Sequence, residues 1–268
     1  MDLIGTSAVV TGAGQGMGRQ IARRLMQHGA NVLVFELNGE VAERTAQELS
    51  AEAEGGARAI AHAGSVAVPA DVDAAFEAAT AAFGTPQLLV NNAGVASLAL
   101  IVDMPEQDWD AVLDVCAKGP FLCTQAAARR LIAGGLPGAI VNISSINYEA
   151  ATDGLAHYCA AKAAVSQFTK VAAAELAPSA IRVNAIAPGL TRTPMSEGGF
   201  LEGRMGEEFI AHTPMGRFGE PDDIARVAVF LCSEDSGWIT GATVPVDGGG
   251  HIRGLHNYWA TMHETSVA

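Results

Sequence analysis

The chain has 268 residues, of which 49% are hydrophobic and 17% are charged, and its formal net charge is −13. This composition excludes a disordered chain, and no apolar run approaches the roughly 20 residues that a membrane-spanning helix needs. A strongly acidic surface repels nucleic acid and anionic membranes. We therefore expect a globular protein that binds neither.

The first residues, MDLIGTSAVV, contain no basic segment and pass directly into an apolar run, so we expect no signal peptide and a cytoplasmic protein. The four cysteines lack CxxC or Cys/His ligand spacing, which favours buried free thiols over disulfides or zinc. Three histidines near the C-terminus, His251, His256 and His263, lack carboxylate or cysteine neighbours at ligand spacing. We predict no metal site.

Seven short apolar segments alternate with longer segments rich in Ala, Leu, Glu and Arg. The apolar segments predict buried strands at residues 7–12, 31–36, 57–63, 87–92, 139–144, 181–188 and 242–249. The intervening segments predict helices at residues 16–29, 38–54, 70–83, 106–133, 155–177 and 221–232. This alternation predicts one doubly wound, Rossmann-like α/β domain over residues 1–250, with a seven-stranded parallel sheet.

Two segments fall outside the alternation. Residues 194–215 follow a predicted strand and contain glycine pairs and three methionines, so we expect a mobile lid over a site at the carboxyl end of the sheet. Residues 251–268 form a C-terminal tail that carries Tyr258 and Trp259. Our hypothesis is that these aromatic side chains dock on a neighbouring subunit near its active site.

The first predicted strand ends in the glycine-rich sequence TGAGQGMG, which leads directly into a helix. Glycines let the backbone turn sharply and bring its amides close to a pyrophosphate at the helix N-terminus. The second predicted strand ends at Glu36, where a carboxylate can accept hydrogen bonds from both hydroxyls of a ribose. These features predict a dinucleotide site formed by Gly12, Gln15, Gly16, Met17, Gly18, Glu36 and Leu37.

Glu36 favours NAD over NADP. A 2′-phosphate would meet the carboxylate at a few ångströms, at a cost of about 1–4 kcal/mol in a partly solvated site. Gln15 in the glycine loop and Leu37-Asn38 after the carboxylate supply no cation that would offset the repulsion. We predict NAD as the cofactor.

Tyr158 and Lys162 lie four residues apart in HYCAAKAAV and so share one face of a predicted helix. Ser145 is the second residue of the pair Ser144-Ser145, at the carboxyl end of the fifth predicted strand. The lysine ammonium would lower the pKa of Tyr158, which would take the hydroxyl proton of an alcohol while Ser145 donates a hydrogen bond to the substrate oxygen. Lys162 would also reach the nicotinamide ribose. His157 points about 100° away from the tyrosine, which argues against a direct catalytic role.

These motifs resemble those of the short-chain dehydrogenase/reductase family over residues 1–250. TGAGQGMG is similar to the family's TGxxxGxG loop, and NNAG is similar to its fourth-strand motif. Ser145 and the YxxxK pattern of Tyr158 and Lys162 resemble its catalytic set, and PGLTRT resembles its nicotinamide-binding turn. The resemblance implies further cofactor contacts from Asn92, Ala93, Gly94, Pro188, Gly189, Thr191 and Thr193. It also implies a homotetramer, and small residues in 106–133 and 155–177 suit close packing against a second subunit.

The chain departs from the family pattern twice. Cys116 in DVCAKGPF occupies a slot that is commonly asparagine, whose main-chain carbonyl is implied to hold a water that connects the lysine to solvent. Since any residue supplies a carbonyl, we expect Cys116 to keep this catalytic relay in weakened or rerouted form. Ser65 and Val66 occupy the positions after the third strand at which the family often has an Asp-Val pair that contacts adenine. We expect them to retain that contact.

Residues 95–98, 146–150 and the lid residues Met195 and Phe200 are expected to face the substrate. Most of these residues are apolar, which favours an NAD-dependent dehydrogenase of a small or cyclic hydrophobic secondary alcohol or ketone. The alternative is a 3-oxoacyl thioester reductase of the acyl-carrier-protein type, although such biosynthetic reduction usually employs NADPH. A non-enzymatic NAD-sensing protein is a third reading from a different functional class.

Overall fold

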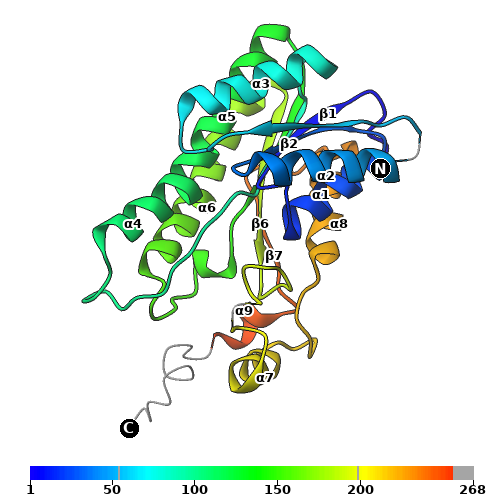
Figure 1. The fold of residues 1–268 in the computed structure, drawn as a ribbon. Coiled ribbons are helices and arrows are strands. Elements are labelled where there is room, and N and C mark those ends of the chain that lie inside the picture. The colour runs from blue at the N-terminus through cyan, green and yellow to red at the C-terminus, as the bar shows by residue number, and fades with distance from the viewer. Residues whose placement is uncertain (54, 198, 256–268) are drawn as a thin grey trace.

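The computed structural model describes residues 1–53, 55–197 and 199–255, and a seven-stranded parallel sheet runs through its centre (Figure 1). The strands lie in the order β3-β2-β1-β4-β5-β6-β7, which confirms the predicted doubly wound sheet. Their bounds are β1 (Ser7–Thr11), β2 (Asn31–Glu36), β3 (Ala59–Ala63), β4 (Leu88–Asn91), β5 (Gly138–Ile143), β6 (Ile181–Pro188) and β7 (Thr243–Val246).

Helices cover both faces of the sheet (Figure 1). One layer contains α1 (Gly16–Gln27), α2 (Gly39–Glu52) and α8 (Pro221–Cys232), and the other contains α3 (Pro69–Phe83), α4 (Glu106–Leu113), α5 (Gly119–Gly134) and α6 (Ala156–Leu176). Strand side chains alternate between the two apolar layers: Val10 and Val34 face the first, whereas Val9 and Leu33 face the second. Burial on both faces explains why the strands are apolar almost throughout.

The path of the chain creates a crevice at the carboxyl ends of β1 and β4. The chain runs outward from β1 to β3 and then returns to place β4 on the other side of β1. The loops that follow these two strands therefore diverge, and ligands of doubly wound sheets bind at such a reversal. None of the helices in the described ranges is long and apolar enough to cross a bilayer.

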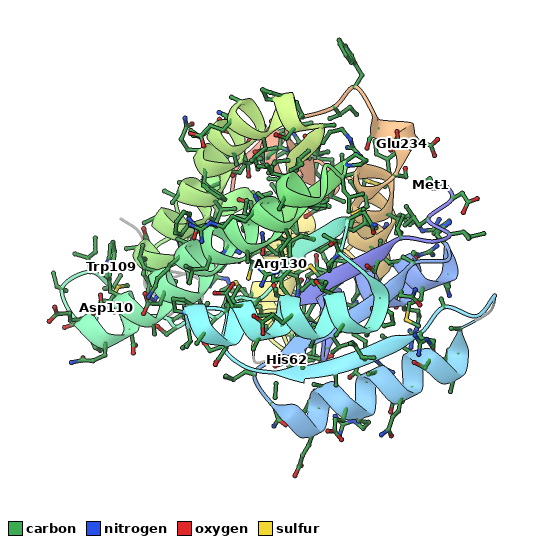
Figure 2. The ribbon with its side chains drawn as sticks, turned by 90° about the horizontal axis from the view of Figure 1, so that it is seen from above. Met1, His62, Trp109, Asp110, Arg130 and Glu234 are labelled. Atoms are coloured by element: carbon green, nitrogen blue, oxygen red, sulfur yellow. The ribbon has the colours of Figure 1, made fainter. Side chains whose placement is uncertain are left out.

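The helix predicted at 106–133 forms, but a π-helical turn, Asp114–Lys118, divides it into α4 and α5. Pro120 has no N–H and cannot donate to the carbonyl of Cys116 four residues earlier. The N–H of Gly119 instead donates to the carbonyl of Asp114, five residues earlier. The turn brings Cys116 against α6, beside Ala161 and Tyr158. Figure 2 shows Trp109 and Asp110 of α4 projecting from the side of the molecule.

The segment expected to be a lid contains a helix, α7 (Gly203–His212), that the sequence pattern did not predict. Met205 and Phe209 of α7 are buried against Phe218, in a small apolar cluster separate from the two main layers. The surrounding glycines obscure the helical periodicity of this short segment. A further short helix, α9 (Gly250–Arg253), follows β7. Tyr258 and Trp259, expected to contact a neighbouring subunit, lie outside the described residues.

Asp222, near the start of α8, ties that helix to α1. Its carboxylate accepts hydrogen bonds from the Arg24 guanidinium, from Gln20 Nε2 at 2.9 Å and from Arg226 Nε at 2.8 Å. The hydrogen bonds from Arg24 are the main reason that the pKa of Asp222 lies well below its ordinary value of 3.8. Since the side chains are only partly exposed, this pair is less screened than a typical surface ion pair.

We predict that Asp222→Ala lowers the free energy of unfolding at pH 7 by about 1–3 kcal/mol, because Arg24 and Arg226 lose their carboxylate. The folded state lowers the pKa of Asp222, so its contribution is complete above the unfolded-state pKa and declines as the pH falls below about 4. Urea titrations of wild type and variant should therefore differ less near pH 3 than at pH 7. An equal difference at both pH values would contradict the prediction. Asp73→Ala, which breaks the more exposed pair with Arg130, should cost less than about 0.5 kcal/mol.

Candidate active site

The glycine loop between β1 and α1 requires bare backbone at three positions. Gly12 and Gly16 adopt left-handed φ values of +60° and +55°, which disfavour a side chain. A Cβ on Gly12 would lie 2.9 Å from the Cα of Ala93, and a Cβ on Gly18 would lie 2.2 Å from the carbonyl oxygen of Gly12. Gly18 thus lets the helix pack closely against the loop.

A cleft of about 320 Å³ lies between this loop and the ends of β2, β4 and β5. Most of the predicted cofactor residues line it: Gly12, Gln15, Gly16, Met17, Glu36, Leu37, Ser65, Val66, Asn92, Ala93, Gly94, Tyr158, Lys162 and Thr193. Val115, which the sequence reasoning did not include, also lines the cleft, as does Val95, which was expected to face the substrate. Gly18 does not line the cleft, because it packs against the carbonyl of Gly12.

Glu36 is held at the rim of the cleft by backbone amides. Its Oε2 accepts the Gly14 N–H at 3.1 Å, and its Oε1 accepts the Leu37 N–H at 2.9 Å. In the described part of the chain, Lys162 is the single lysine or arginine that lines the cleft, and it comes from α6 rather than from β2. The β2 end of the cleft is therefore acidic.

Thr11 and Asn92 fix the loop that follows β4. The Thr11 hydroxyl accepts the N–H groups of Asn92 and Ala93, both at 3.0 Å. The Asn92 amide donates to the carbonyls of Thr11 and Gly12, also at 3.0 Å. The sequence reasoning missed Thr11, although its place at the end of β1 beside the NNAG motif was a usable signal.

The two serines after β5 have different surroundings. Ser144 is turned towards α6, where its hydroxyl donates to the carbonyl of Lys162 at 3.0 Å and pairs with the hydroxyl of Ser166 at 2.9 Å. The hydroxyl of Ser145 bonds instead to Asn147 within the loop. Ser145 and Tyr158 both line a second cavity, which adjoins the cleft and is described below. This arrangement fits Ser145, rather than Ser144, as the group that meets a substrate oxygen.

Tyr158 and Lys162 lie on consecutive turns of α6, as the spacing predicts. The Lys162 ammonium lies 5.3 Å from the centre of the Tyr158 ring and donates to the carbonyl of Ile143 at 2.8 Å. Lys162 is only 3% exposed, so its charge acts in a poorly screened environment. An ammonium has three donors, and two remain for groups in the cleft.

Cys116 lies close to the cleft but bonds to the loop after β4. Its thiol donates to the carbonyl of Val95 and accepts the Val95 N–H, both at 3.3 Å. A Cβ on Gly94 would lie 3.6 Å from the Cys116 sulfur and 3.9 Å from the Lys162 ammonium. The side chain in the usual asparagine slot therefore supports the loop, and the predicted relay through its carbonyl stays a prediction.

A second cavity of about 160 Å³ adjoins the cleft on the lid side. Its lining includes the predicted residues Pro188, Gly189, Thr191, Thr193, Met195 and Phe200. Phe209 of α7 completes the apolar wall, and the sequence reasoning missed it because α7 was not predicted. Of the expected substrate-facing residues 95–98, Ala96 is the one that lines this cavity. Polar side chains line the cavity where Ser145, Asn147 and Tyr158 meet and also at Ser144, Thr191, Thr193 and Ser196, whereas much of the remaining wall is apolar.

Two flanking residues are engaged in local structure. The Ser65 hydroxyl accepts the Ala67 N–H at 3.2 Å, and the Ser65 N–H donates to Asp71 Oδ2 at 2.9 Å, so the substituted adenine-site position is held by its own turn. His157 is fully buried, and its Nε2 pairs with the Ser97 hydroxyl at 2.9 Å. Burial lowers the pKa of His157. Through Ser97, His157 supports the loop after β4. This structural role agrees with the prediction that His157 takes no direct part in catalysis.

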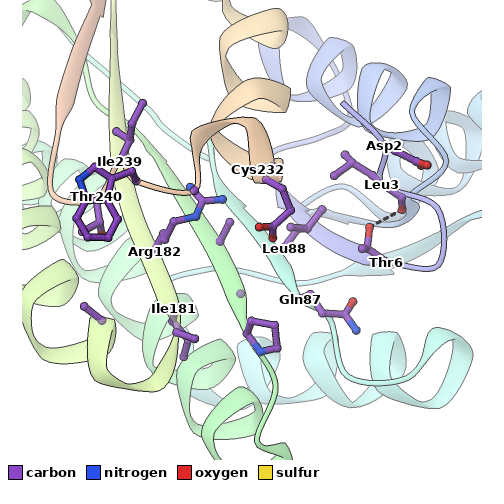
Figure 3. Close-up of a pocket in the computed structure, with 18 residues that line it drawn as sticks. Asp2, Leu3, Thr6, Gln87, Leu88, Ile181, Arg182, Cys232, Ile239 and Thr240 are labelled. Carbon is purple, nitrogen blue, oxygen red and sulfur yellow. Dashed lines mark hydrogen bonds between the residues drawn. The ribbon is translucent and has the colours of Figure 1, made fainter.

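A larger cavity of about 610 Å³ opens at the opposite edge of the sheet, where β4, β5 and β6 begin (Figure 3). Arg182 reaches across it and donates to the carbonyls of Leu231 and Ser233, both at 2.9 Å, at the end of α8. None of the predicted site residues lines this cavity. Ligands of doubly wound sheets bind at the other edge, which is where the cleft and the substrate cavity meet.

A family model described as enoyl-(acyl carrier protein) reductase matches residues 12–251. The chain is 41% identical over 247 residues to a (3R)-3-hydroxyacyl-CoA dehydrogenase of Mus musculus, covering 90% of this chain and 95% of that protein. It is 39% identical over 244 residues to a 3-oxoacyl-(acyl-carrier-protein) reductase FabG of Staphylococcus aureus, covering 91% of this chain and 97% of that protein.

Solved structures share the whole fold. A short-chain type dehydrogenase/reductase from Mycobacterium ulcerans aligns with a TM-score of 0.95 at 29% identity, covering 99% of this chain and 96% of that chain. A chain from Agrobacterium tumefaciens that was solved with bound NADP aligns with a TM-score of 0.85 at 36% identity, covering 93% and 97%.

We predict that Tyr158→Phe reduces turnover by about a hundredfold to ten-thousandfold, because the phenyl ring keeps its packing but cannot exchange a proton. Dinucleotide affinity, measured by titration calorimetry, should stay within about twofold, since the glycine loop and Glu36 are unchanged. Tyr148→Phe is the matched control: Tyr148 lies on the neighbouring loop but lines neither cavity, and its variant should keep wild-type turnover. Equal activity of both variants would exclude Tyr158 as the proton-transfer group.

Proposed function

Since the chain belongs to the short-chain dehydrogenase/reductase family, we propose that it is an NAD-linked oxidoreductase that interconverts the 3-hydroxy and 3-oxo groups of acyl thioesters. The observation that carries the proposal is the meeting of Ser145 and Tyr158 in a largely apolar cavity that adjoins the cleft beside the glycine loop. Interconversion of an alcohol and a ketone needs a proton-transfer group and a redox cofactor, and both must reach the substrate carbon that carries the oxygen.

The residues of the cleft fit a nicotinamide dinucleotide. The Gly12–Gly18 loop leads into the N-terminus of α1, which favours a pyrophosphate, and Glu36 offers acceptors at the end of β2. Lys162 keeps two donors for hydroxyl groups in the cleft. The bound nicotinamide supplies the hydride chemistry that no side chain of the protein can perform.

Tyr158 and Ser145 would act on the substrate oxygen. In oxidation, the Tyr158 phenolate takes the hydroxyl proton of the substrate, and in reduction the neutral phenol returns that proton to the oxygen. The Ser145 hydroxyl donates a hydrogen bond to the same oxygen as negative charge develops on it. The Lys162 ammonium lies 5.3 Å from the centre of the Tyr158 ring, where it attracts the negative charge that develops on the phenol oxygen during proton transfer.

The relatives favour an acyl thioester over the small or cyclic alcohol that the apolar lining alone suggests. Proteins named for 3-hydroxyacyl-CoA oxidation and for 3-oxoacyl reduction match the chain over about nine-tenths of its length. The 160 Å³ cavity suits the short apolar part of such a substrate, while its thioester carrier extends into solvent. The small or cyclic secondary alcohol is the second candidate, because Phe200, Phe209 and Met195 make the cavity wall apolar.

The homotetramer expected from the sequence stays a proposal. Phe121 and Ile132 of α5 and Val171 of α6 are 44%, 51% and 47% exposed and line one groove between the two helices, which supports packing against another subunit. Light scattering at several protein concentrations would measure the assembly. A non-enzymatic NAD-binding role is not favoured by the intact Ser145, Tyr158 and Lys162.

The substrate test measures NAD reduction with both enantiomers of 3-hydroxybutyryl-CoA and with a panel of cyclic secondary alcohols. We expect kcat/KM for one thioester enantiomer to exceed that for every cyclic alcohol by at least about a hundredfold, a difference of about 2.7 kcal/mol in transition-state stabilisation. Higher efficiency with a cyclic alcohol would make the second candidate the function. Binding of NAD without turnover of any substrate would favour the non-enzymatic role.

We predict that wild type prefers NAD to NADP by at least about tenfold in kcat/KM, because Glu36 repels a 2′-phosphate. Replacing the carboxylate and adding a cation, in Glu36→Ala with Leu37→Arg, should reverse the preference, as measured with both dinucleotides at one substrate concentration. Glu40→Ala, which removes an α2 carboxylate that does not line the cleft, should leave the ratio unchanged. Wild-type kcat/KM with NADP equal to that with NAD would show that Glu36 does not select the cofactor.

A further inference from the structure

Asn147 is fixed in one orientation beside the substrate cavity. Its side-chain Nδ2 donates to the carbonyl of Ala150 at 3.2 Å and to the hydroxyl of Thr152 at 2.6 Å. The Ala150 carbonyl can only accept a hydrogen bond, so the NH₂ group must face it and the amide oxygen must face the other way. Asn147 and Thr152 are 9% and 8% exposed, and neither side chain can be reoriented without losing these bonds.

The amide oxygen of Asn147 faces Ser145. The Ser145 hydroxyl donates to Asn147 Oδ1 at 3.1 Å and accepts the Asn147 backbone N–H, also at 3.1 Å. One residue therefore contacts the serine hydroxyl through both its backbone and its side chain. The single hydroxyl hydrogen points at Asn147, which leaves a lone pair, rather than the hydrogen, for the cavity that both residues line.

We propose that Asn147 is a positioning residue that holds the Ser145 hydrogen in the resting enzyme and releases it to the substrate oxygen as negative charge develops there. The inference rests on the proposed function, in which Ser145 donates to that oxygen. No covalent bond of the serine changes: its O–H hydrogen bond moves from Asn147 Oδ1 to the substrate oxygen, while the proton and the hydride follow the route given above.

The chemistry of the two acceptors makes the exchange selective for the transition state. The amide oxygen of Asn147 is neutral, and a hydrogen bond to an oxyanion is roughly twice as strong as one to a neutral oxygen. A ground-state ketone gains little by displacing the amide, whereas the developing alkoxide gains a charge-assisted bond. An interaction that strengthens only in the transition state raises kcat rather than substrate affinity.

The test compares Asn147→Asp, Asn147→Ala and Thr152→Val, using the holoenzyme with saturating NAD and the best 3-hydroxyacyl-CoA substrate. The aspartate presents a charged acceptor, which holds the serine hydrogen more strongly than the neutral amide oxygen does. We expect kcat to fall about 10–100-fold with KM within about threefold, and the effect of deuterium at the substrate carbinol carbon on kcat to increase. The aspartate also places a negative charge beside the reacting groups, so the pH profile of kcat should change in this variant.

The other two variants separate positioning from charge. Asn147→Ala removes the acceptor, and Thr152→Val removes a partner of the Asn147 amide without touching Ser145. Both should lower kcat about 3–10-fold and increase the isotope effect, with no shift of the pH profile. Thr152→Ser, which keeps the hydroxyl, should retain more of the rate than Thr152→Val. Asn31→Asp, the same chemical change at the remote start of β2, should leave kcat unchanged.

Three outcomes would overturn the proposal. One is wild-type kcat in Asn147→Asp and Asn147→Ala. Another is a loss of rate that matches losses of thermal stability and NAD affinity, with an unchanged isotope effect, because that result describes a purely structural residue. The third is a wild type that turns over no secondary alcohol, a result that also overturns the substrate proposal. If wild type instead oxidises cyclic alcohols but no acyl thioester, only the substrate proposal fails, and the same variants are measured with the alcohol.

Discussion

The buried ammonium of Lys162 is the constraint around which the site is built. Moving a cation out of water costs several kcal/mol unless the protein supplies compensating partners. Lys162 is 3% exposed, and its hydrogen-bond partner in the described chain is the carbonyl of Ile143, at the end of β5. That single bond leaves two donors at the wall of the cleft. A ligand that offers hydroxyl groups there completes the solvation of the ammonium, so cofactor affinity and the placement of Lys162 are coupled.

Holding that ammonium in place requires α6 to keep its register against β5, and a chain of buried polar side chains does this. Asn142 of β5 donates to the Thr169 hydroxyl of α6 at 2.9 Å and accepts from Asn91 of β4 at 2.8 Å. Ser144 adds its bond to the Lys162 carbonyl. Apolar contacts between a helix and a sheet tolerate sliding, whereas directed hydrogen bonds do not. These polar groups therefore determine where Tyr158 and Lys162 meet the ends of the strands.

The sequence predicted the sheet almost completely because its strands are buried on both faces and read as continuous apolar runs. The grouping of the glycine loop with Ser145, Tyr158 and Lys162 at one edge of the sheet could be predicted because each has a characteristic spacing. The π-helical turn at Cys116 could not, although Pro120 was visible, because helical periodicity continues across it. The Asn147 contacts with Ser145 and Thr152 depend on the path of an irregular loop, which no periodicity describes. The amphipathic α7 was missed because glycines flank it on a short segment.

Both departures from the family pattern fall where backbone groups carry the local structure. At Cys116 the thiol replaces an amide but still bonds to both backbone groups of Val95, and Pro120 removes the usual helical donor for the Cys116 carbonyl. At Ser65 the backbone N–H is bound by Asp71 whatever side chain it carries. At Ser65 substitution is tolerated because the backbone contact with Asp71 does not depend on the side chain, whereas at Cys116 the thiol itself makes the contacts that hold the loop. Ser145 is the opposite case: its hydroxyl must exchange one acceptor for another, and so its environment includes an amide whose orientation is fixed.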